Sequence, residues 1–102
     1  MCSMSKGNAV RRKANPLESS LQSEIIDYAC IRGWFCVKAT TPSLRGLPDV
    51  VAVRAGRTIW IEVKREDEEA RRQQKLRAKE MRAHDAEVFE VDTFAEAREI
   101  LK

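Results

Sequence analysis

Three residues in the middle of the chain have the side chains and spacing that metal-assisted phosphodiester hydrolysis needs. Asp49 follows Pro48, and Glu62 and Lys64 come after a further twelve residues. Carboxylate oxygens bind Mg²⁺, which polarises a phosphoryl oxygen and helps to ionise the attacking water. A nearby lysine positions the water or neutralises developing charge. Taken singly, Asp49 also suits a turn after proline, and Glu62 and Lys64 a solvated strand face.

The strands that carry these residues can pair in two registers. If residues 55–56 form a two-residue turn, Asp49 lies directly opposite Glu62, with Cβ atoms roughly 4.5–5.5 Å apart. If Gly56 is instead a bulge, the register slips by one residue and Glu62 points to the other face. We favour the first register because it clusters the polar groups, although this preference presupposes the site that it supports.

A third carboxylate is expected from the first helix. The apolar sector of its helical wheel is defined by Leu17, Leu21, Tyr28 and Ile31. Glu24 falls inside this sector, where a carboxylate is costly unless a metal ion or Lys64 compensates it. Alternatively, Glu24 sits at the edge of the sector and reaches water.

The elements that must position these residues are read from periodicity and from start and stop signals. Asn15 and Pro16 begin a helix that ends at Gly33. Residues 40–47 contain proline and glycine and are typical of a loop. The expected strands are 34–37, 48–53, 58–64 and 87–91, and the other expected helices are 65–83 and 94–101. The order predicts an α/β fold, α-β-β-β-α-β with a C-terminal helix.

Length and charge indicate one domain with a basic arm. The chain has 102 residues, which suits a single domain over 15–102, and residues 1–14 are polar and without periodicity, so we expect a flexible arm. The net charge of +3 comes from this arm, which holds four of the 19 basic residues, leaving 15 against 16 acids elsewhere. A basic arm can contact phosphates.

Several classes of protein are excluded by composition. No apolar run approaches the roughly 18 residues of a membrane span, and the first residues lack the apolar centre of a signal peptide. We therefore expect a cytoplasmic protein that does not contact a membrane. The 3 cysteines have no CxxC spacing, which argues against a disulfide framework or a zinc knuckle. The single histidine, His84, argues against a histidine-metal nuclease.

The motif formed by Pro48-Asp49 and the later Glu62-Val63-Lys64 resembles the PD-(D/E)xK nuclease motif. Residues 46–51 are similar to the GxPD strand of the virus-type replication-repair nuclease (VRR-NUC) family, and residues 61–64 to its second core strand. Gln74 matches a family glutamine on the next helix, and Glu24 an acidic position on the first. Residues 71–73 depart from the family's usual Ser/Thr-Pro start. The resemblance covers residues 17–92.

This resemblance implies a restriction-endonuclease-like core with a mixed sheet flanked by helices. It also implies a site for Mg²⁺ or Mn²⁺, with a ligand set of Glu24, Asp49, Glu62 and the backbone carbonyl of Val63. Lys64 would assist the attacking water. Gln74 would support the site or contact the substrate.

The resemblance further implies a structure-selective DNA endonuclease. The family's small members resemble resolvases of four-way (Holliday) junctions, and symmetric cuts need two sites, so a homodimer on branched or duplex DNA is expected. The alternatives are a flap or restriction-type nuclease of the same superfamily, a non-catalytic DNA-binding module, or a small α/β interaction protein. Thr41, Ser43 and Arg45 lie in the loop before Asp49 and suit phosphate contacts, or else an ordinary solvent loop.

Overall fold

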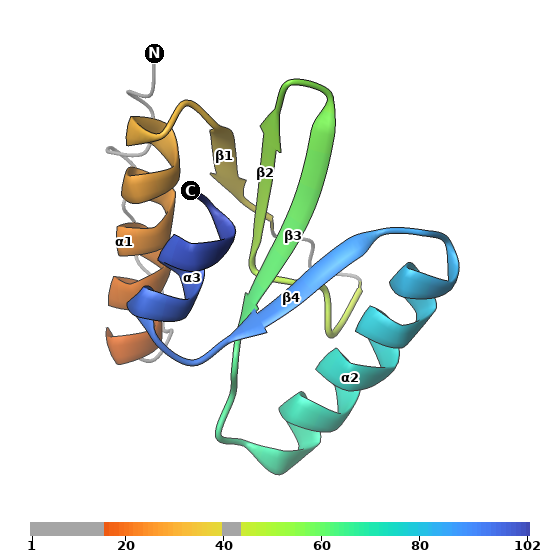
Figure 1. Cartoon of the computed structure of the whole chain (residues 1–102). Helices are drawn as coiled ribbons and strands as arrows, with labels where there is room; N and C mark the ends of the chain where they lie inside the picture. The colour runs from red at the N-terminus through yellow and green to blue at the C-terminus, as the bar shows by residue number, and fades with distance from the viewer. Residues whose placement is uncertain (1–15, 40–43) are drawn as a thin grey trace.

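The structure is a computed structural model that describes residues 16–39 and 44–102 (Figure 1). The basic arm expected over residues 1–14, and Asn15, lie outside this part. The elements are α1 (Pro16–Ile31), β1 (Phe35–Lys38), β2 (Val50–Arg54), β3 (Arg57–Val63), α2 (Glu68–Ala83), β4 (Glu87–Val91) and α3 (Phe94–Ile100). The expected order of helices and strands is confirmed. None of the described helices is both long and apolar enough to cross a membrane.

The four strands form one mixed sheet in the order β1-β2-β3-β4. The first three strands are antiparallel to one another, and β4 runs parallel to β3. α2 connects the two parallel strands, as such a pair requires. α1 and α3 pack together on one face of the sheet, and α2 lies on the other face against β4 (Figure 1). The fold is therefore the mixed, helix-flanked sheet that the resemblance of the motifs implies.

The register of the β2–β3 hairpin is set by its turn. Arg54 pairs with Arg57, and the two residues between them, Ala55 and Gly56, both have positive φ values of 52° and 83°. This is the two-residue turn whose twist matches paired strands. The first of the two expected registers is confirmed. If the pairing is continued by one residue past Val50 and Ile61, Asp49 lies opposite Glu62.

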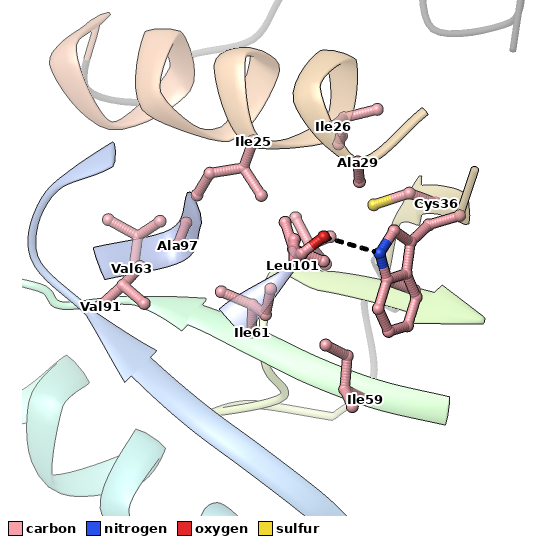
Figure 2. Packing of buried hydrophobic residues seen from close by; sticks show 13 residues of the cluster. Ile25, Ile26, Ala29, Cys36, Ile59, Ile61, Val63, Val91, Ala97 and Leu101 are labelled. Atoms are coloured by element: carbon pink, nitrogen blue, oxygen red, sulfur yellow. Dashed lines mark hydrogen bonds between the residues drawn. The ribbon is translucent and has the colours of Figure 1, made fainter. Parts of the chain in front are cut away.

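The core lies between the sheet and the α1–α3 layer (Figure 2). Its fully buried side chains include Ile25, Ala29, Ile59, Ile61 and Leu101. Strand alternation supplies one half of this layer, because Ile59, Ile61 and Val63 share one face of β3. The other face of the same strand is left for the polar side chain of Glu62.

A hydrogen bond and a stacked arginine hold the chain beyond α3 against the sheet. The indole N–H of Trp34 donates to the backbone oxygen of Leu101 at 3.0 Å (Figure 2). The guanidinium of Arg54 lies 4.4 Å from the centre of the Trp34 ring. It also donates to the backbone oxygens of Arg32 and Lys102, both at 2.9 Å. These contacts join the ends of α1 and α3 at the edge of the core.

The buried stripe of α1 differs from the expected one. It consists of Gln22, Ile25, Ile26 and Ala29, whereas Ile31 is 80% exposed. Leu21 and Tyr28 of the expected sector do pack against the core, but they lie at its half-buried border, and the side chain of Leu17 lies outside the described part. The expectation was wrong for Ile31, because Ile25 and Ala29 face the sheet and lie at the centre of the stripe. As a result Glu24 is exposed.

α2 begins three residues later than the sequence predicts because Asp67 caps it. The side chain of Asp67 accepts a hydrogen bond from the backbone N–H of Glu69 at 3.0 Å. Such a cap satisfies an amide that has no partner within the helix. Residues 64–67 therefore form a short connection between β3 and α2.

The segment before β2 docks on α2 through Gly46. Its φ is +80°, and a Cβ at this position would collide with the backbone carbonyl of Gln73. The side chain of Arg77 donates to the backbone oxygen of Arg45 at 3.1 Å, which fixes the same segment. Asp49 follows three residues later, so this docking helps to place it.

Gly46→Ala should therefore destabilise the fold more than the same change at another glycine of positive φ. We expect a loss of about 3 kcal/mol, from backbone strain and from overpacking against α2. Gly56→Ala is the matched control, because a Cβ there meets nothing within 4 Å. Strain alone should cost this control about 1–2 kcal/mol. Urea unfolding measures both, and equal losses would contradict the docking.

Candidate active site

Asp49 is the best-anchored carboxylate of the candidate site. It is 7% exposed, and its Oδ2 accepts a hydrogen bond from the backbone N–H of Val63 at 2.7 Å. Oδ1 accepts a hydrogen bond from Nη2 of Arg65, also at 2.7 Å. Burial raises the pKa of Asp49, and the Val63 amide, Arg65 and Lys38 offset only part of this rise. Asp49 thus lies fixed at the end of β3.

Glu62 is buried with an oxygen that lacks a partner. The residue is 2% exposed, and its Oε1 makes no hydrogen bond. Burial, followed by the nearby charges of Glu90 and Asp49, raises the pKa of Glu62 to about 7 against the partial offset of Arg82 and Arg65. An unsatisfied buried carboxylate is costly, and a bound cation would remove much of this cost.

Gln74 reaches the same end of β3 from α2. It is buried, and its Nε2 donates to the backbone oxygen of Val63 at 3.3 Å. Its Oε1 is a second buried oxygen without a hydrogen-bond partner. Four of the predicted residues therefore meet at one place, because Asp49 and Gln74 both bond the backbone of Val63 and Glu62 precedes it.

Lys64 lies beside this group with its side chain exposed. Its backbone N–H donates to the backbone oxygen of Val91 at 2.9 Å, which extends the pairing of β3 with β4. Its Nζ lies 3.6 Å from Oδ2 of Asp92 at the end of β4. The ammonium thus pairs with Asp92 in an exposed ion pair, which contributes little to stability.

Glu24 does not join the other carboxylates. In residues 16–39 and 44–102, no group of three histidine, cysteine, aspartate or glutamate side chains is arranged to hold a metal ion. The expected convergence of Glu24 with Asp49 and Glu62 is therefore not found. The physical reason is the rotation of α1 about its axis, which turns Gln22 and Ile25 inward and Glu24 outward.

The predicted DNA contacts precede Asp49. Thr41 and Ser43 lie outside the described residues. Arg45 is exposed, and its backbone oxygen is bound by Arg77 of α2. Its side chain is available to solvent, and its contact with phosphate stays a prediction.

Two charged residues near the site are missed by the sequence reasoning. Glu90 pairs with Glu62 in the parallel register of β3 and β4. Counting residues across a hairpin cannot find such a pair, because the helix α2 separates the two strands. Arg65 pairs with Asp49, and its position directly after Lys64 is the signal that could have drawn attention to it.

The raised pKa of Glu62 predicts how stability depends on pH without added metal. The folded protein retains this proton up to a pH of about 7, whereas the unfolded chain releases it near the ordinary value of 4.5. The free energy of unfolding should therefore fall as the pH rises from 4.5 to 7. Glu62→Gln should flatten this fall and be the more stable protein at high pH.

Thermal unfolding in a chelator at a series of pH values measures this effect. Glu99→Gln is the control, because Glu99 is exposed and pairs with Lys102. The control should keep the wild-type slope. An unchanged slope in Glu62→Gln would show that burial of this carboxylate does not govern its proton affinity.

Comparison with known proteins gives a structural relative. A solved structure described as "VRR_NUC domain" superposes with a TM-score of 0.69 at 22% sequence identity, covering 81% of this chain and 91% of that chain. No family model matches the sequence, and no curated protein matches it. At this identity the likeness concerns the fold. The chain has the fold of a VRR_NUC domain, as the resemblance of its motifs predicts.

Proposed function

We propose that this protein is a metal-dependent DNA endonuclease that cuts branched DNA, with the four-way junction as its preferred substrate. The observation that carries the proposal is the buried, unpartnered Oε1 of Glu62 beside Asp49. The VRR_NUC fold supports it. Symmetric cleavage of a junction needs two sites, so we propose a homodimer.

The residues at the strand end fit a hard divalent cation. All the donors are oxygens: the carboxylates of Asp49 and Glu62, the carbonyl of Val63 and the side-chain oxygen of Gln74. Two of these oxygens are buried without a hydrogen-bond partner, as expected for groups that need a cation. Oxygen donors suit Mg²⁺ or Mn²⁺. Such an ion, when bound, polarises a phosphoryl oxygen and lowers the pKa of the attacking water.

The chain's own residues would orient the reactants. Asp49 is fixed by the Val63 amide, so its position does not depend on the substrate. Lys64 is exposed on a flexible stem, and release from Asp92 would let its ammonium orient water or neutralise charge on the phosphate. Arg45 would contact the flanking phosphates. These roles combine positioning with electrostatic stabilisation.

The activity test uses labelled four-way junctions, flaps, nicked duplexes and plain duplexes with Mg²⁺ or Mn²⁺. Asp49→Asn, Glu62→Gln and Lys64→Ala should each reduce the cleavage rate by about 100-fold or more. Glu99→Gln should retain the wild-type rate. Binding of junctions without cleavage would favour the non-catalytic DNA-binding module, and preferred cutting of flaps would favour the flap nuclease.

A second test concerns the contribution of α1. Glu24 lies on the exposed side of this helix and does not join Asp49 and Glu62. We therefore expect Glu24→Gln to retain the wild-type cleavage rate, measured beside Asp49→Asn on the same junction. A loss of about 10-fold or more in Glu24→Gln would restore Glu24 as the helix carboxylate that supports the metal site.

A further inference from the structure

Arg65 holds the one oxygen of Asp49 that the backbone leaves open. Oδ2 accepts the Val63 amide and Oδ1 accepts the Arg65 guanidinium, each at 2.7 Å. The carboxylate is 7% exposed, whereas the Arg65 side chain is 34% exposed. A positive charge of the protein thus already occupies the side of Asp49 that a bound cation would need.

This arrangement has two opposite consequences. Without metal, the guanidinium stabilises the buried carboxylate, whose pKa it helps to lower. With metal, the same guanidinium places a positive charge next to a divalent cation, and the two charges repel each other. Arginine cannot relieve this repulsion by losing a proton, because it remains charged at any ordinary pH. The side chain has to move away.

We propose that Arg65 is an internal cation that competes with the divalent ion for Asp49 and thereby sets the metal affinity of the site. The proposal rests on the proposed function, since it requires a metal at Asp49. Arg65 lies in the connection between β3 and α2, outside both elements, and its partly exposed side chain has water on one side. Arg65 is a positioning residue, which acts on the reaction through Asp49 and not by contact with the reacting atoms.

The test measures metal binding and stability rather than cleavage. Isothermal titration calorimetry with MnCl₂ on the full chain, without DNA, should show that Arg65→Gln binds Mn²⁺ about 10-fold more tightly than the wild type, for the loss of one nearby repelling charge. Thermal unfolding in EDTA should show that the same variant is less stable, because Asp49 has lost its positively charged partner and keeps only the Val63 amide.

Two further variants serve as controls. One keeps the positive charge at position 65 with a different side chain, and the other removes a positive charge elsewhere on the surface. Arg65→Lys keeps the charge and should bind Mn²⁺ with nearly the wild-type affinity. Arg72→Gln removes the same charge from an exposed ion pair with Glu69, whose side chains are 63% and 60% exposed, and should leave both affinity and stability unchanged. An affinity of Arg65→Gln equal to or weaker than the wild type would overturn the proposal, as would tighter binding by Arg72→Gln.

Failure of the inference is distinguishable from failure of the proposed function. If the wild type binds Mn²⁺ and cuts DNA, but Arg65→Gln binds Mn²⁺ no more tightly, only the inference fails. If Arg65→Gln tightens binding while the wild type cuts no DNA, the inference stands and the nuclease proposal fails. Absence of Mn²⁺ binding in both proteins overturns both.

Discussion

The candidate site depends on the register between β2 and β3. In this register the apolar residues of β3 face α1 and α3, while Glu62 faces the opposite side and lies level with Asp49. A slip by one residue would bury Glu62 in the apolar core and expose Ile61, at a cost that the rest of the fold could not offset. The two-residue turn at Ala55 and Gly56 and the burial of Ile59 and Ile61 therefore enforce the same arrangement.

The carboxylates at the strand end are held there at the expense of stability. Burial raises the pKa of both Asp49 and Glu62, and the nearby Glu90 adds a like charge next to Glu62. A structural core gains nothing from such a cluster, since apolar side chains of similar volume would pack without desolvating a charge. Groups kept in a costly state are characteristic of functional sites. This contrast, rather than the motif alone, makes Glu62 the central residue of the site.

The sequence predicted what depends on local pattern. The order of elements, the hairpin and the placement of Asp49 opposite Glu62 follow from alternation, turn residues and helix signals over short stretches of chain. The place of Gln74 near Val63 was expected only from the resemblance of the motifs to a known family. The orientation of α1 did not follow, because a helical wheel of alternating apolar and polar residues has no unique inward direction until the helix is packed on a sheet. The partner of Glu62 in β4 could not be predicted either, because the register of two parallel strands joined by a helix cannot be found by counting residues across a turn.

Because side chains alternate along each strand, the two faces of the sheet have different roles. The packing that holds the strands together lies mainly against α1 and α3 (Figure 2). The polar groups of the candidate site lie at the strand end near α2, where Gln74 bonds Val63. Substitutions on the exposed side of α2 can thus accumulate with little effect on folding. Such a division leaves the choice of substrate free to diverge among descendants of one stable scaffold.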